Sequence, residues 1–493
     1  MPALTQASTR SHTLFTRLFC GILLLFLLLS AGGTTAQSQA TVISQVKDIY
    51  SGTGSAFPEA IAAWNNNLFF TATDGISGSE LWASNGTAAG TLLIKDIRSG
   101  SAHANIHTLV PANAMLFFSA NDGQNGQELW VTNGTAATTR LVKDINPGTG
   151  SSINSVSAAG QMVSLNGKLI FAADNGVNGE ELWISDGTAA GTTLLKDINT
   201  SGAAGIQEMT ILNGVVYFTA LTNNFQRELW KTNGTTAGTV MVKEIEPMMG
   251  SDPAELTVSN GMLYFQAFTL SDGVELWKSN GTAAGTVMVK DIHPDGSSHP
   301  RGLVDINGTL YFVASEGVNG AELWKSNGTA AGTVMVKDIR PGSEGAYPET
   351  GYLFDEFINA NGILYFTANN GTNGQELWKS NGTAAGTVMV KDIRSGSTTS
   401  SPSRLTYFNG LVYFQADDGT YGRELWQSDG SAAGTMLTAD LNLLGHADPF
   451  GMTTMNGSLY YAANNGISGK ELWQLKPGAV PFNHRLYLPF VRK

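Results

Sequence analysis

The chain has 493 residues, of which 28 are basic and 40 are acidic, and its formal net charge at pH 7 is −12. This acidic balance argues against a nucleic-acid-binding protein, because nucleic-acid backbones are bound by surfaces rich in Lys and Arg. Cys20 is the only cysteine, which excludes a disulfide framework, and charged residues make up only 14% of the chain.

Residues 1–36 have the pattern of a secretory signal peptide. Arg10 and Arg17 accompany an apolar run over 18–29, and small residues follow at 34–36. The run is shorter than the roughly 20 residues that a membrane-spanning helix needs, although an uncleaved N-terminal anchor is the alternative. We therefore expect an exported protein, secreted or held at the cell surface, with no integral membrane span after signal removal.

A Glu-Leu-Trp triplet recurs nine times within residues 46–475, at intervals of 47 to 54 residues. Internal repeats of this length indicate a protein built from nearly identical small units. Because every unit carries the tryptophan, we interpret it as a structural residue that packs between units; a ring of sugar-stacking aromatics is the alternative. The nine positions are Trp82, Trp130, Trp183, Trp230, Trp277, Trp324, Trp378, Trp426 and Trp473.

One unit, residues 301–339, shows the expected strands. Four short strands are predicted, at 302–306, 310–314, 322–326 and 333–339, and the intervening Asn307-Gly308 is typical of a tight hairpin turn. The strands are apolar on both faces, so each small sheet needs cover on both sides. Stacking such sheets radially provides this cover. The sequence therefore predicts an all-β protein, a β-propeller of nine four-stranded blades, with two rings or an open superhelix as alternatives.

The two ends of the repeat predict how the ring closes. Residues 46–49 match the last strand of a unit but precede the first complete unit, whereas the unit that ends at Trp473 lacks this strand. An N-terminal strand that completes the ninth blade would remove the exposed sheet edges. Residues 477–493 follow as a C-terminal tail, which we interpret as either a surface-sorting tail or a strand packed on the ring.

Two insertions, at 146–165 and 342–359, predict the binding face. Both fall between the last strand of one unit and the first strand of the next. Insertions in repeat proteins tend to map to the binding face, so we expect a protein or glycan partner at these loops. The candidate ligand-binding residues are Trp64, which lies outside the repeat register, and Tyr347, Tyr352, Phe354, Asp355 and Glu356 of the second insertion.

The loops between the second and third strands are rich in Asp, Asn and Gly, as in Asp74-Gly75 and Asp122-Gly123. Their oxygens could bind Ca²⁺, but the same residues form ordinary turns, and no copy has the spacing of a calcium-binding loop. We expect no cofactor, with Ca²⁺ as the alternative. The chain has no recognisable catalytic motif, so no catalytic residue is assigned. The repeated Glu and Lys-Asp residues are expected to form ion pairs or backbone hydrogen bonds.

The copies at 181–188, which reads Glu-Leu-Trp-Ile-Ser-Asp-Gly-Thr, and at 424–430 resemble the bacterial ELWxxDGT repeat family. The resemblance covers residues 46–475 and implies an exported, surface-exposed protein, without implying an activity. Residues 120–130 are more loosely similar to the tryptophan-docking repeats of quinoprotein β-propellers, which implies tryptophan stacking between blades. The adjacent cysteine pair that is often associated with quinoprotein alcohol dehydrogenases is missing.

Together these features predict a binding or cell-surface interaction module. One alternative is a propeller-type enzyme, a glycan hydrolase or a quinoprotein-like protein, which would need acids or bases that only one or two blades carry. The seventh unit, with Glu344, Glu349, Asp355 and Glu356, is the place where such residues gather. The other alternative is a purely structural surface repeat.

Overall fold

The computed structural model describes residues 24–26, 41–153, 161–347 and 357–477. In these ranges all regular elements are β-strands, and no helix long and apolar enough to cross a membrane occurs. The chain divides into two compact units, and the larger, Gln45–Gln474, contains the repeats. Most of the predicted signal segment and all of the predicted tail after residue 477 lie outside the described residues.

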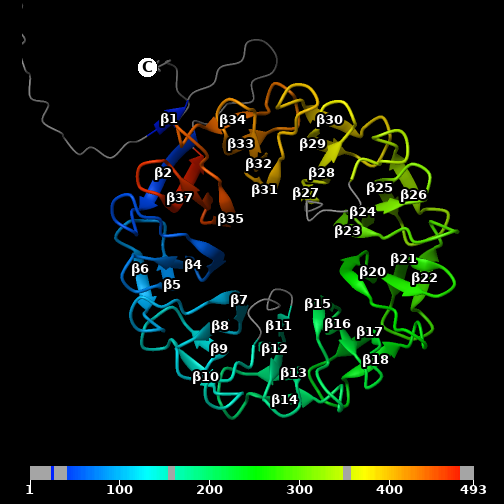
Figure 1. Cartoon of the computed structure of the whole chain (residues 1–493), viewed down its shortest axis with the longest axis horizontal. Helices are drawn as coiled ribbons and strands as arrows, with labels where there is room; N and C mark the ends of the chain where they lie inside the picture. Colours follow the sequence, from blue (N-terminus) through cyan, green and yellow to red (C-terminus); the bar gives the residue numbers. More distant parts are fainter. Residues whose placement is uncertain (1–23, 27–40, 154–160, 348–356, 478–493) are drawn as a thin grey trace, which may run out of the picture. The chain divides into compact units, whose positions relative to one another are not determined.

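The repeats form nine antiparallel sheets, arranged as the blades of a ring; eight have four strands, and the ninth has a fifth strand at its edge (Figure 1). Within blades 1 to 8 the strands follow one another in chain order, from strand A nearest the centre to strand D at the outside. The A–B and C–D turns therefore emerge on one rim of the ring. The B–C loops and the D–A connections between blades emerge on the opposite rim, which we call the loop rim.

The strands of the first three blades are β3 (Glu59–Trp64), β4 (Asn67–Thr73), β5 (Ser79–Ser84), β6 (Thr91–Lys95), β7 (His107–Ala112), β8 (Met115–Asn121), β9 (Gln127–Thr132), β10 (Arg140–Lys143), β11 (Met162–Leu165), β12 (Lys168–Asp174), β13 (Glu180–Ser185) and β14 (Thr193–Lys196). Blades 4 to 6 are built from β15 (Gln207–Leu212), β16 (Val215–Leu221), β17 (Arg227–Thr232), β18 (Val240–Lys243), β19 (Ala254–Ser259), β20 (Met262–Thr269), β21 (Gly273–Ser279), β22 (Val287–Lys290), β23 (Arg301–Ile306), β24 (Thr309–Ser315), β25 (Ala321–Ser326) and β26 (Val334–Lys337). Blades 7 to 9 consist of β27 (Ile358–Ala360), β28 (Ile363–Asn369), β29 (Gln375–Ser380), β30 (Val388–Lys391), β31 (Ser403–Phe408), β32 (Leu411–Asp417), β33 (Arg423–Ser428), β34 (Met436–Ala439), β35 (Phe450–Met455), β36 (Ser458–Asn464), β37 (Lys470–Pro477) and β2 (Thr41–Lys47).

The ninth blade closes the ring with the N-terminal strand. Its sheet has the order β1-β2-β37-β36-β35, so β2 serves as strand D beside β37. The backbone N–H of Ile49 donates to the Glu471 carboxylate (2.9 Å), and that of Ala56 donates to the Lys470 carbonyl (2.9 Å). The short β1 (Leu24–Phe26) pairs antiparallel with β2. The predicted all-β propeller of nine blades, closed by the N-terminal strand, is confirmed.

The core lies between neighbouring blades rather than within them. Trp324 of blade 6 packs with Leu310 and Phe312 of its own blade and with Tyr264 and Val289 of blade 5. All nine triplet tryptophans are buried, and eight of them belong to clusters of this kind. Because each blade covers a face of its neighbour, one set of packing residues serves all the interfaces, and the sequence repeats it.

The repeated lysine of strand D belongs to the same interface. Lys290 Nζ lies 5.5 Å from the centre of the Trp324 ring and donates a hydrogen bond to the Thr333 carbonyl (3.0 Å). The charged group therefore gains a cation–π contact and an acceptor from the next blade. This arrangement of lysine over tryptophan recurs at seven of the interfaces.

Candidate functional site

The buried glutamate of each triplet holds the loop rim in place. Glu128 is fully buried. Its Oε2 accepts hydrogen bonds from Ile145 N (3.0 Å) and Ser152 Oγ (2.6 Å), and its Oε1 accepts from Asn146 N (3.2 Å) and Ser152 N (3.1 Å). One carboxyl group thus replaces water for four donors of the D–A connection. Glu275 makes the same contacts with Ile292, His293 and Ser298.

These glutamates predict a pH-dependent stability. Burial raises the pKa of Glu80 and Glu424 to about 8, although backbone N–H groups act in the opposite direction. Burial likewise raises the pKa of Glu128, Glu181, Glu322, Glu376 and Glu471 to about 7. The folded protein therefore binds these protons more tightly than the unfolded chain, whose glutamates have a pKa near 4.5. This contribution to stability is complete below pH 4.5 and is lost as the pH rises through 7 to 8.

We accordingly expect the melting temperature, measured by calorimetry, to fall between pH 5 and pH 8.5, because the titrating glutamates release protons in that window. Glu424→Gln removes one titrating group and should reduce the slope. A melting temperature that is constant or rises with pH over this range would contradict the prediction.

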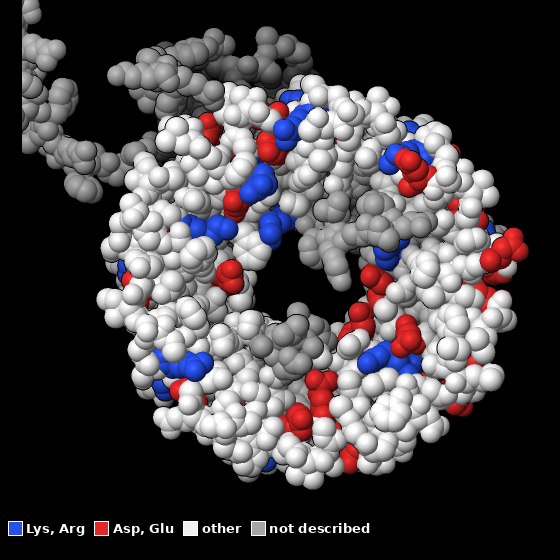
Figure 2. Space-filling view, in the orientation of Figure 1, with Lys and Arg blue, Asp and Glu red and all other residues white. Residues whose placement is uncertain are grey.

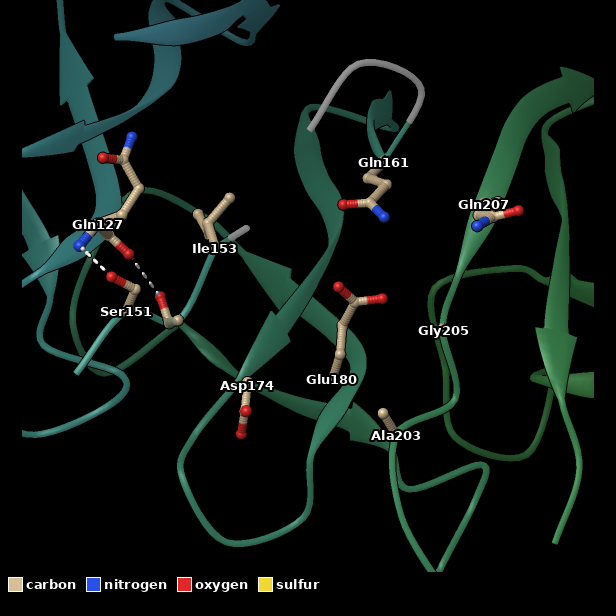
Figure 3. A pocket seen from close by; sticks show the side chains of 10 residues that line it. Gln127, Ser151, Ile153, Gln161, Asp174, Glu180, Ala203, Gly205 and Gln207 are labelled. Atoms are coloured by element: carbon tan, nitrogen blue, oxygen red, sulfur yellow. Dashed lines mark hydrogen bonds between the residues drawn. The ribbon is translucent and has the colours of Figure 1, made fainter. Parts of the chain in front are cut away.

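A partly open cavity of about 580 Å³ lies on the loop rim, among blades 2, 3 and 4 (Figure 3). It is lined mainly by amide, hydroxyl and carboxyl side chains. The lining residues are Gln127, Ser151, Ser152, Ile153, Gln161, Asp174, Glu180, Ala203, Gly205 and Gln207.

The cavity forms where the first insertion breaks the repeat. Strand A of blade 3, β11, has four residues, whereas its neighbours β7 and β15 have six. In β7 the register shifts between His107 and Val110, and in β15 it shifts between Gln207 and Thr210. β11 pairs with β12 without such a shift. Strand A of blade 3 is therefore shorter than the A strands of blades 2 and 4 and lacks the register shift that both of them have.

Glu180 and Gln161 are anchored to the backbone of the same residue, Ile206, at the cavity. Glu180 Oε1 accepts from Ile206 N (3.0 Å), and Gln161 Nε2 donates to Ile206 O (2.9 Å). Figure 3 shows the carboxyl group of Glu180 and the amide of Gln161 facing each other across the cavity. Burial raises the pKa of Glu180, while the positive charge of Arg227 in blade 4 opposes this shift. The site thus presents a carboxyl and an amide in fixed orientations.

Glu180 occupies a position that sequence reasoning missed. It is the residue just before the triplet, at the start of strand C. The residue at this position differs among the copies, although the triplet itself does not change. That variation next to an unchanging triplet is the sequence feature that could have indicated a binding position. The nine residues are Ser79, Gln127, Glu180, Arg227, Val274, Ala321, Gln375, Arg423 and Lys470.

Two of the ligand-binding candidates predicted from the sequence, Trp64 and Tyr347, are described by the structure, and neither lines the cavity. Trp64 ends β3 at an A–B turn, on the rim opposite the cavity, and its ring lies 5.7 Å from that of Phe69. Tyr347 is buried against Phe357 (6.1 Å) and Phe366 (6.5 Å) between blades 6 and 7. The other candidates, Tyr352, Phe354, Asp355 and Glu356, lie outside the described residues.

The Asp and Asn residues of the B–C loops form turns. Asp74 Oδ1 accepts from the backbone N–H groups of Ile76 (2.8 Å) and Ser77 (2.8 Å), and Asn465 makes the same pair of bonds with Ile467 and Ser468. In the described part of the chain, no group of three or more His, Cys, Asp or Glu residues is arranged to hold a metal ion.

The radial blades and the rim cavity define a β-propeller with a recessed polar site on one rim. No family model and no curated protein matches the chain. Among solved structures, it is similar to puromycin hydrolase (12% identity, TM-score 0.38, 85% of this chain and 60% of that chain) and to a prolyl endopeptidase (13% identity, TM-score 0.40, 73% and 53%). TolB from Acinetobacter baumannii has 12% identity and a TM-score of 0.29 over 55% of this chain and 64% of that chain. The chain thus spans less than two thirds of each of these proteins, and likeness at this level assigns no activity.

Proposed function

We propose that this chain is an exported binding module that holds a glycan in the rim cavity. The observation that carries the proposal is the lining of planar amide and carboxyl groups at the place where the repeat is broken. Sugar hydroxyls both donate and accept hydrogen bonds, and the amides of Gln161 and Gln207 together with the Glu180 carboxyl complement them. Because Ile206 already holds Glu180 and Gln161, these two side chains lose little conformational entropy when a ligand binds.

The cavity favours binding over glycan hydrolysis. A glycosidase generally needs two carboxyl groups that flank the same bond. Asp174 lies opposite Glu180 in the β12–β13 register, but its Oδ1 accepts from Gly176 N (2.7 Å) in the B–C turn. Figure 3 shows the Asp174 side chain directed away from Glu180. One carboxyl group, rather than two, therefore faces the proposed ligand.

A glycan array with the purified protein tests the proposal. For a glycan that binds, calorimetry on the double variant Glu180→Gln/Gln161→Ala should show an affinity at least about tenfold lower, because a charged acceptor and an amide are lost. Gln375→Ala is the matched control, since Gln375 has the same strand position in blade 7 and is not part of the cavity lining.

The proposal fails if no glycan binds, or if the double variant retains the affinity of the wild type. Release of a shortened glycan on incubation would instead support the hydrolase alternative.

A further inference from the structure

Exposed apolar side chains are concentrated on the loop rim. In the described ranges, twelve large apolar side chains are more than half exposed, and eleven of them lie in B–C loops or D–A connections. The twelfth, Leu92, lies on strand D of blade 1. The eleven are Phe57, Ile76, Val177, Phe225, Met248, Met249, Leu270, Val318, Leu443, Leu444 and Ile467. The rim with the A–B and C–D turns carries none among the described residues, so the two rims differ in chemistry.

Four of these residues occupy the same position at the tip of a B–C loop. Ile76, Val177, Val318 and Ile467 are 75%, 86%, 70% and 68% exposed. Each tip is held in a fixed turn: Asn175 Oδ1, for example, accepts from Val177 N (3.0 Å). The tips are therefore presented to solvent by ordered backbone.

Two D–A connections add apolar pairs. Met248-Met249 and Leu443-Leu444 stand where the other connections carry mostly Ser, Gly, Thr, Pro or Asp, and Leu444 is 99% exposed. Glu246 is buried, and its carboxylate accepts from Met248 N (3.1 Å) and Leu270 N (3.0 Å). This bridge ties the methionine loop to the next B–C loop, so the apolar side chains of both are held on the same side of the ring.

We propose that the loop rim docks on a lipid surface with uncharged or zwitterionic headgroups. Equivalent positions of a closed ring lie on a circle, so the tips contact one plane together. The exposed apolar side chains are spread around the ring over blades 1, 3, 4, 5, 6 and 9 and the connections next to them, whereas the buried core of a protein–protein interface is one close-packed patch. A bilayer interface accepts separate side chains, each inserted into the boundary between headgroups and acyl chains.

The charge of the chain selects among lipid surfaces. The five-residue segments around the four tips, at 74–78, 175–179, 316–320 and 465–469, contain no Lys or Arg. The net charge is −12, so an anionic membrane would repel the protein. Figure 2 shows that most of the displayed face consists of uncharged residues and that several of the Asp, Glu, Lys and Arg residues gather around the central opening. The attraction is therefore apolar rather than electrostatic.

Cosedimentation of the full chain with phosphatidylcholine vesicles tests this proposal. The rim variant combines Ile76→Ser, Val177→Ser, Val318→Ser, Leu444→Ser and Ile467→Ser. The expected result is a partition coefficient at least about tenfold below that of the wild type, because each lost side chain removes several CH₂ groups from the bilayer. Both proteins keep the apolar run at 18–29, so a difference between them comes from the rim. These residues are more than two thirds exposed, so the variant should keep the wild-type melting temperature.

A matched control carries Leu92→Ser, Val240→Ser, Val287→Ser, Val334→Ser and Val388→Ser, which alter exposed positions of the outer strands. It should partition as the wild type does. Equal partitioning of the rim variant and the wild type would overturn the proposal. So would tighter binding on addition of phosphatidylserine, or a rim-dependent dimer, seen by light scattering, without a rim-dependent gain in vesicle binding. These measurements need no glycan and use other residues, so their outcome is independent of the proposed glycan site.

Discussion

Glu128→Leu is expected to lower the free energy of unfolding by at least about 3 kcal/mol. Leucine is of similar size but accepts no hydrogen bond, so Ile145 N and Asn146 N lose their acceptor inside the protein, and Ser152 N and Oγ keep only the Gln127 carbonyl. A buried donor left without a partner costs about 1–3 kcal/mol, and part of this cost is relieved when the loop opens to water. Equilibrium urea denaturation at pH 7 measures the loss.

The same substitution should also abolish ligand binding at the cavity, because Ser152 lines it. Glu376→Leu in blade 7 is the matched control. Glu376 accepts from Ile393 N, Arg394 N and Ser400, so a comparable loss of stability is expected, but the cavity is untouched. Wild-type stability in Glu128→Leu would show that the loop does not depend on this carboxyl group. If both variants bound the ligand equally well, the Glu128 carboxyl group would not be needed to shape the cavity.

Trp324→Ala is expected to cost about 3–5 kcal/mol, as is usual when a large buried aromatic side chain is removed. The indole fills the interface between blades 5 and 6, where Tyr264, Val289 and Phe312 surround it. Its loss leaves a cavity between two sheets and also takes away the ring beneath Lys290. The urea midpoint and the melting temperature should both fall.

Lys290→Met separates packing from charge at the same interface. Methionine keeps an apolar stem over the indole but loses the cation and the hydrogen bond to Thr333 O. We expect a cost of about 0.5–2 kcal/mol, smaller than that of Trp324→Ala. A larger effect from the lysine than from the tryptophan would mean that electrostatics, rather than packing, joins the blades.

Much of the ring could be predicted because its determinants are local or repeated. Asn307 and Gly308 have φ values of 52° and 83°, the left-handed conformation that the predicted hairpin turn requires. The unpaired strand before the first unit predicted the closure of the ninth blade, which β2 completes. Backbone hydrogen bonds were one of two roles expected for the repeated glutamate, and Glu128 makes them to the D–A connection.

The site could not be predicted from the repeat, because it depends on which residues of different blades lie close together. The sequence predicted that aromatic residues of the second insertion bind the ligand, yet one of them, Tyr347, is buried in the core. The cavity instead combines Gln127, Glu180 and Gln207 from three blades, and none of them stands out alone.

The apolar tips show the same limit. Ile76 and Ile467 look like ordinary hydrophobic residues in glycine-rich loops until the turn geometry directs them outward.

The sequence by itself thus determined the blade, the number of blades and the closure of the ring, because short-range turn chemistry and one repeated interface specify all three. Only the tertiary structure decided which rim residues share a cavity and which face solvent. Those outcomes depend on how loops far apart in the chain meet when neighbouring blades pack.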